Sequence, residues 1–339
     1  MYVSPMGTNT IRWSHTRSTS LAKCPRAFWY GYYAWGEEIQ RWTELVSPLL
    51  THDMLAGQVV DAMVNVTLMR ARTNKEQPED LAELGVQEFR KALKLSAIDG
   101  EYMRRELKLP DHPVQVLHCD FYREVADKGT VERCEGKIRK CLVNWVESEV
   151  WERIQTIHPS KWMTQKAAQQ GKIVTRWQVE GLLVASAFDF WFKDDDKIYI
   201  FEWKSGFPAE DAQAVSRQQL ASYALWAVAV KGYEPENVFG QSVFLQLPVH
   251  WNPMTFTQDE LYAAQMRLAT DKARELEFAL PTGKTDQYGR EQFAASMNDC
   301  PPKPEVGRCR DCKYRGLCNE GKELVRPYVE KRCPAIILG

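Results

Sequence analysis

Glu202 and Lys204 stand two residues apart at the end of an apolar stretch, and Ser205-Gly206 follows them. Residues two apart on a β-strand project from the same face, so the acid and the amine would lie side by side there. Burying such a pair is costly unless both groups find partners. The alternative is a surface ion pair, which contributes little to stability. The surrounding residues decide between the two interpretations.

Strand pairing would bring a second acid, Asp189, to this position. Two strand-like stretches, 182–193 and 197–204, are separated by an acidic turn. Counting outward from a two-residue loop at 195–196 places Asp189 directly opposite Glu202. By alternation, the other face of this hairpin forms an aromatic core layer made of Phe188, Phe190, Phe192, Tyr199, Phe201 and Trp203.

Two opposed carboxylates can hold a hard divalent cation through their oxygen atoms, so Asp189 and Glu202 are candidate metal ligands. Asp61 is a third candidate, on an upstream helix where Gly57 lies one turn away on the same face and permits close backbone approach. Lys204 beside the metal would position a water molecule and stabilise charge developing on a phosphate. These groups suit metal-assisted phosphodiester hydrolysis.

The helices and strands that position these residues are expected to form an α/β domain. Predicted strands with apolar residues on both faces alternate with predicted helices, as in a sheet that helices cover on both sides. A helix-rich block at 78–168 is expected to be an insertion or cap. The predicted helices cover 14–23, 24–33, 52–72, 131–157, 208–231 and 258–278, and the predicted strands cover 173–180, 182–193, 197–204 and 238–247.

Composition narrows the function classes. The 339 residues are 44% hydrophobic and 26% charged with a net charge of −1, as in an ordinary globular protein without a global basic field. No signal pattern and no long apolar run appear, so a cytoplasmic protein without membrane contact is expected. Nucleic acid would have to bind a local basic patch, for which the candidates are Arg17, Lys23, Arg26, Arg308, Arg310, Lys313 and Arg315.

Nine cysteines are present, and several crowd the C-terminal end. In a reducing compartment such crowding favours metal binding over disulfides. Cys309, Cys312 and Cys318 have short spacings, and Cys24 precedes a proline far upstream. By spacing alone, four thiolates suit either zinc or an iron–sulfur cluster.

The order Gly57-x3-Asp61, Asp189, Glu202-Trp203-Lys204 and Gln219-Leu-Ala-Ser-Tyr223 resembles the PD-(D/E)XK nuclease superfamily, and specifically its RecB-type branch. The resemblance implies a restriction-endonuclease-like core, a central mixed sheet flanked by helices. It also implies Mg²⁺ or Mn²⁺ on the acids, and catalytic roles for Asp189, Glu202, Lys204, Gln219 and Tyr223. Gln218 is adjacent, but only Gln219 gives the four-residue step to the tyrosine. The sequence departs from the RecB-type pattern at Asp61, where members of that branch usually have histidine.

The cysteines add a second resemblance, to iron–sulfur RecB-type nucleases such as the CRISPR-adaptation-associated exonucleases and the AddB subunit of helicase–nucleases. It implies that Cys24, Cys309, Cys312 and Cys318 hold a [4Fe–4S] cluster joining the N- and C-terminal segments. Cys300 and Cys333 are alternative ligands.

The expected function is therefore a metal-dependent DNA exonuclease acting on single strands or duplex ends. One alternative is a DNA-end-binding adaptor with weak or no cleavage, working with a helicase, an integrase or another complex subunit. Another is a cluster-bearing redox or sensor protein. The expected organisation is N-terminal helices at 1–52, a core helix with a helical insertion at 53–170, the nuclease core at 171–250 and C-terminal helices with the cysteines at 251–339.

Overall fold

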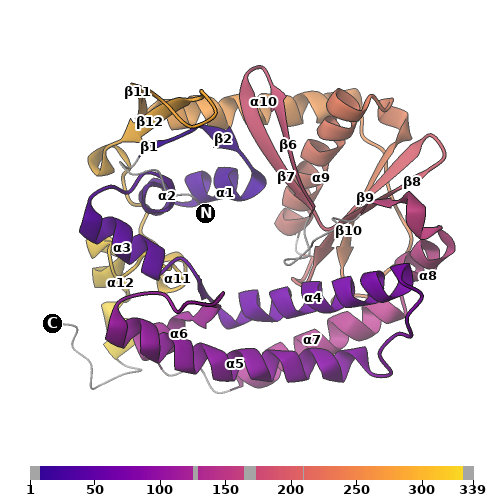
Figure 1. Ribbon diagram of the computed structural model, residues 1–339, viewed down its shortest axis with the longest axis horizontal. Helices are drawn as coiled ribbons and strands as arrows, with labels where there is room; N and C mark the ends of the chain where they lie inside the picture. The colour runs from indigo at the N-terminus through magenta and orange to yellow at the C-terminus, as the bar shows by residue number, and fades with distance from the viewer. Residues whose placement is uncertain (1–7, 125–128, 164–172, 209, 331–339) are drawn as a thin grey trace. The chain divides into compact units, whose positions relative to one another are not determined.

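Two units share the chain in alternating segments in the computed structural model (Figure 1), which describes residues 8–124, 129–163, 173–208 and 210–330. The first unit comprises Met1–Leu55, Lys91–Thr130 and Asp271–Gly339. The second comprises Ala56–Arg90 and Val131–Thr270. The helix-rich block predicted at 78–168 therefore contributes to both units.

The centre of the second unit is a four-stranded mixed sheet in the order β10-β9-β8-β5. β9 and β10 are parallel, while β8 and β5 add to the other side as antiparallel neighbours. Helix α9 connects β9 to β10 and packs on both (Figure 1), which is the helical crossover that parallel strands require. This mixed sheet with helices confirms the predicted α/β class. Its strands are β5 Trp162–Met163, β8 Phe190–Asp194, β9 Lys197–Lys204 and β10 Val238–Phe244, and α9 is Glu210–Lys231.

The strand predicted at 182–193 is wrong in one respect, because it breaks at Asp189. Its first half is β7 (Leu182–Phe188), which pairs antiparallel with β6 (Ile173–Val179) rather than with β9. Only its second half, β8, pairs with β9. Asp189 lies in the bend and accepts the backbone N–H of Trp203 at 2.8 Å through Oδ2, so a side chain takes the place of a ladder carbonyl.

The predicted register of the hairpin is confirmed. Asp195 and Asp196 form the turn, and Phe190 faces Phe201 as the count from that turn requires. Phe192 stacks on Tyr199 with ring centroids 5.0 Å apart, so the aromatic layer forms as expected. Phe188 is the exception: it contacts Tyr223 and Trp226 of α9, on the other face. The bend at Asp189 interrupts the alternation of side chains between the two faces of the sheet. Odd- and even-numbered residues before the bend therefore do not point to the same faces as those after it.

Two tryptophans pack against the aromatic layer, Trp145 from a helix and Trp162 from the edge strand β5. Trp145 lies 5.0 Å from Trp203 and Trp162 lies 5.5 Å from Phe190, measured between ring centroids. Trp145 belongs to α7 (Thr130–Val146), and α8 (Glu149–Thr156) follows it, so the single helix predicted at 131–157 is wrong. Ser148 ends the run because its hydroxyl accepts the Trp151 N–H at 2.9 Å and caps α8.

Helix α4 (His52–Arg72) has the bounds that its apolar spacing predicts, and α5 (Leu81–Glu106) follows it. Both helices begin and end in different units, as does α10 (Gln258–Leu276). None of the described helices combines the length and the apolar character needed to cross a lipid bilayer.

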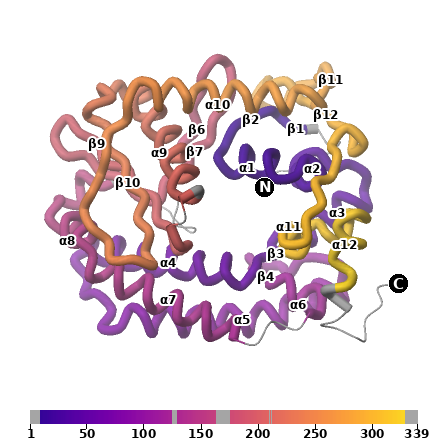
Figure 2. Tube along the Cα trace, turned by 180° about the vertical axis from the view of Figure 1, so that it is seen from behind, coloured from indigo at the N-terminus to yellow at the C-terminus, as the bar shows by residue number. Residues whose placement is uncertain are grey.

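The first unit is mostly helical, with a three-stranded sheet in the order β1-β12-β11 (Figure 2) that the sequence did not predict and a two-stranded parallel pair, β3-β4. β11 contains Pro281 and Gly283, which mark a loop in sequence, and most of its residues are exposed. The helices predicted at 14–23 and 24–33 are confirmed as α1 and α2. The remaining elements are β1 Thr8–Asn9, β2 Arg12–Trp13, α1 His15–Lys23, α2 Pro25–Tyr32, α3 Glu37–Leu45, β3 Leu49–Leu50, β4 Val116–Leu117, α6 His118–Tyr122, β11 Ala279–Thr285, β12 Glu291–Ala295, α11 Val306–Arg310 and α12 Asn319–Glu330, with short 3₁₀ turns at Pro159–Lys161, Pro235–Asn237 and Met297–Asp299.

A buried ion pair fastens the ends of this unit together. Arg17 is 3% exposed, and its guanidinium binds both carboxylate oxygens of Glu275, which is also 3% exposed and accepts the Tyr33 hydroxyl. Arg17→Met is expected to destabilise the protein by about 3–5 kcal/mol, because Glu275 would remain buried without its cation. Chemical denaturation measures this loss. Adding Glu275→Gln should recover part of it, and a double variant as unstable as the sum of both single variants would contradict the pairing.

Candidate active site

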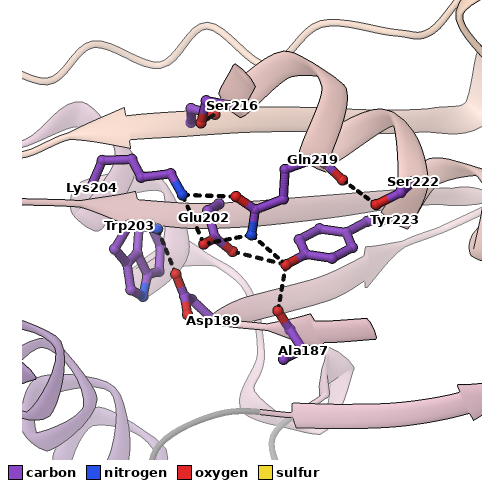
Figure 3. Close-up of polar contacts among 10 residues, drawn as sticks. Ala187, Asp189, Glu202, Trp203, Lys204, Ser216, Gln219, Ser222 and Tyr223 are labelled. Atoms are coloured by element: carbon purple, nitrogen blue, oxygen red, sulfur yellow. Dashed lines mark hydrogen bonds and ion pairs between the residues drawn. The ribbon is translucent and has the colours of Figure 1, made fainter. Parts of the chain in front are cut away.

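Lys204 is the centre of a hydrogen-bonded network in the second unit (Figure 3). Its ammonium Nζ lies 3.0 Å from Glu202 Oε1 and 2.8 Å from Gln219 Oε1. Glu202 is only 4% exposed, whereas the Lys204 side chain is 28% exposed. The amine can therefore reach solvent or a ligand, while the acid that holds it faces the interior.

Gln219 uses its whole side-chain amide within this network. Its Oε1 accepts from Lys204, and its Nε2 donates to Glu202 Oε1 at 2.9 Å and to the Tyr223 hydroxyl at 2.6 Å. Gln219 and Tyr223 reach the same point because they are one turn apart on α9. Gln218 is exposed instead, and its Oε1 accepts from Arg267 at 3.0 Å.

Tyr223 links the network to the bend that carries Asp189. Its hydroxyl donates to the backbone carbonyl of Ala187 at 2.6 Å, two residues before that acid (Figure 3). Sequence reasoning missed Ala187, and no residue-type signal could have revealed it, because a backbone carbonyl makes the contact. Burial raises the pKa of Tyr223 well above its ordinary value, and the charges of Glu202 and Asp189 raise it further. The phenol therefore stays protonated and acts as a donor.

Two buried carboxylates and one ammonium give this site a negative balance of charge. Asp189 is 3% exposed and Glu202 is 4% exposed, and both lie close enough to Tyr223 to act on its pKa. Buried carboxylates favour cations, and their hard oxygen atoms suit Mg²⁺ or Mn²⁺. The donor set at the end of β9 therefore fits a divalent metal ion.

The upstream helix α4 approaches the same strand end at Gly57. A Cβ atom on Gly57 would lie 2.9 Å from the hydroxyl of Ser205, which directly follows the lysine, so a side chain there would displace that hydroxyl. Asp61 lies one turn further along α4 and is half-buried. Within the described ranges, no three His, Cys, Asp or Glu side chains are arranged as a metal site. The role of Asp61 as a third ligand stays a prediction.

The four cysteines of the predicted cluster all belong to the first unit, where each is half-buried. Burial, together with the nearby thiols of Cys24, Cys309 and Cys318, raises the pKa of the Cys312 thiol to about 11. A Cβ atom on Gly321 would lie 3.6 Å from the sulfur of Cys318 and 3.7 Å from that of Cys309. The four cysteines therefore lie near one another, and the absence of a side chain at 321 leaves space beside two of them. Among the described residues no three of these thiols are arranged as a metal site, so the cluster stays a prediction. Cys333 lies outside the described residues.

Two of the arginines expected to contact phosphate are wrong candidates. Arg17 is enclosed with Glu275, and Arg315 is 4% exposed with its guanidinium bound to Glu124 at 2.5 Å. A buried, paired arginine cannot serve a ligand without losing its partner. Both stabilise the first unit instead.

Gln219→Ala is expected to lower the activity of the site by about 10- to 100-fold, because the residue holds both Lys204 and Glu202 in place. The rate of metal-dependent cleavage measures this effect. Gln218→Ala is the matched control and should keep wild-type activity. Equal losses in the two variants would show that the network does not position the lysine.

A family model described as the PD-(D/E)XK nuclease superfamily matches residues 12–319, which is most of the chain and includes the whole Glu202–Lys204–Gln219–Tyr223 network. A search of curated proteins finds no match.

Proposed function

The chain belongs to the PD-(D/E)XK nuclease superfamily, and from that premise we propose that it is a metal-dependent deoxyribonuclease that acts on DNA ends or single strands. The observation that carries the proposal is the network in which Lys204 lies between Glu202 and Gln219 beside the buried Asp189. In a surface ion pair the carboxylate would be exposed, whereas Glu202 is 4% exposed and also accepts from the buried Gln219. Exonuclease action is supported by the resemblance of the motifs to the RecB-type branch.

Asp189 and Glu202 would hold Mg²⁺ or Mn²⁺, with Asp61 as a further ligand. When bound, the metal supplies a polarised phosphoryl oxygen and a water of lowered pKa. Lys204 has three N–H donors, and Glu202 and Gln219 account for two of them. The third can donate to the attacking water or to a phosphate oxygen, where it stabilises developing negative charge. Gln219 and Tyr223 fix the lysine and the glutamate in that geometry.

The test is a cleavage assay with labelled linear, end-blocked and circular DNA, single- and double-stranded, in Mn²⁺ or Mg²⁺. End-dependent trimming should leave circular and end-blocked substrates intact. Cleavage of circular DNA would show that the enzyme is an endonuclease and not an exonuclease. Tight binding to ends without cleavage would favour the alternative, an adaptor in an assembly with a helicase, an integrase or another subunit.

A second proposal concerns the cysteines, which we infer hold a [4Fe–4S] cluster through Cys24, Cys309, Cys312 and Cys318. It is supported by their grouping in one unit and by the space that Gly321 leaves beside two of the sulfurs. Zinc is the competing occupant, because four thiolates also suit it. Cys300, whose side chain is fully buried, is an alternative ligand.

Cys24→Ser and Gly321→Val are expected to remove most of the protein-bound iron and sulfide, the first by losing a ligand and the second by filling the space beside Cys309 and Cys318. Metal and sulfide analysis of anaerobic preparations measures the loss. Cys119→Ser is the matched control, because Cys119 is half-buried in the same unit but outside the group. A colourless wild-type protein with bound zinc would contradict the proposal.

A further inference from the structure

Phe207 is an exposed aromatic residue three positions after Lys204. Its exposed fraction is 63%, although the strand that precedes it is buried. Among the described residues of the second unit, the only other large aromatic side chain with comparable exposure is Tyr262, at 64% on α10. Leaving this much phenylalanine surface in water costs solvation free energy that a ligand covering the ring would recover.

The backbone around Phe207 is held on both sides. The Lys204 carbonyl accepts the Leu245 N–H at 2.9 Å, and Gln246 Nε2 donates to the Ser205 carbonyl at 2.7 Å. After the aromatic residue, the Pro208 carbonyl accepts from Gln213 Nε2 at 3.1 Å. A following proline also restricts the backbone of Phe207 to extended conformations. The backbone that carries the exposed ring is therefore already constrained. Binding of a ligand to the ring would cost little conformational entropy of this segment.

From this geometry we infer that Phe207 stacks on a nucleobase of the strand that is cut, and that the site prefers an unpaired base there. Three residues span at most about 11 Å of backbone, and successive nucleotides of one strand are about 3.4 Å apart along a duplex. The ring thus reaches a base within about three nucleotides of the phosphate at Lys204. An internal base pair hides its faces, whereas a single strand or a frayed end exposes them. The inference rests on the proposed nuclease function and adds the strandedness of its substrate.

Binding of a labelled single strand without metal ions, followed by fluorescence anisotropy, tests the contact separately from cleavage. Phe207→Ala should weaken binding by about 5- to 100-fold, while Phe207→Trp should retain it. In Mn²⁺, Phe207→Ala should raise KM and leave kcat nearly unchanged. Tyr262→Ala is the matched control and should bind like the wild type.

A single abasic nucleotide moved along the strand locates the stacked base. At one position it should weaken wild-type binding to the level of Phe207→Ala and should weaken that variant no further. If Phe207→Ala binds like the wild type while DNA is still cut, the inference fails and the proposed function stands. If binding depends on Phe207 but nothing is cut, the proposed nuclease fails and the stacking contact stands. A wild-type protein that does not bind single strands overturns the contact outright.

Discussion

Replacing Lys204 by alanine is expected to lower the rate of DNA hydrolysis by about 10²- to 10⁴-fold, the largest loss from any single change in this chain. The lysine is the one member of the network that is both held by two partners and open to solvent. Without it, the network loses the ammonium group that would orient water or stabilise charge on the phosphate. Single-turnover cleavage of labelled DNA measures the loss.

Lys197→Ala is the matched control for this variant. Lys197 is exposed at the opposite end of the same strand, so removing its charge leaves the site intact. Circular dichroism should confirm that the Lys204→Ala variant is folded, because Glu202 keeps its bond to Gln219. Cleavage at the wild-type rate by folded Lys204→Ala would refute the assignment of the site.

Asp189→Asn is expected to lower activity by more than about 10²-fold, because it removes the negative charge of the proposed metal ligand while an amide group of the same shape replaces the carboxylate. Asparagine can still accept the Trp203 N–H, so stability should change little. The loss should appear in metal affinity and in cleavage rate, and not in thermal unfolding. Calorimetric titration with Mn²⁺ and the cleavage assay measure the two effects.

Asp189→Ala separates the two roles of this residue. It leaves the Trp203 N–H buried without an acceptor, which should cost about 1–3 kcal/mol of unfolding free energy in addition to the activity. If Asp189→Asn keeps metal binding and cleavage while Asp189→Ala loses stability alone, the carboxylate is only a structural connector at the strand break.

The sequence predicted most of what depends on periodicity. The turn at Asp195 and Asp196 and the strict alternation after it fix the register of β8 on β9, and regular apolar spacing fixes both ends of α4. Asp61 falls on that helix as expected, yet its spacing cannot say whether it reaches the other acids.

What the sequence did not reveal depends on single contacts. The break at Asp189 arises because one carboxylate takes a backbone N–H from β9, and apolar residues continue on both sides without interruption. The end of α7 similarly depends on the hydroxyl of Ser148. The Ala187 carbonyl that orients Tyr223 has no side-chain signature. The spacing of apolar residues predicts which face of a helix or strand is buried. Each of these features depends instead on one hydrogen bond between a side chain and the backbone, which that spacing does not reveal.

The most direct measurement of the central claim is the single-turnover rate of DNA cleavage as a function of Mn²⁺ concentration, in the wild type, Lys204→Ala and Asp189→Asn. The wild-type rate should rise from zero in chelator to a plateau. Lys204→Ala should lower that plateau at an unchanged midpoint, whereas Asp189→Asn should move the midpoint to higher Mn²⁺. Cleavage that persists in chelator, or curves that coincide for all three proteins, would contradict a metal-dependent site built on Asp189, Glu202 and Lys204.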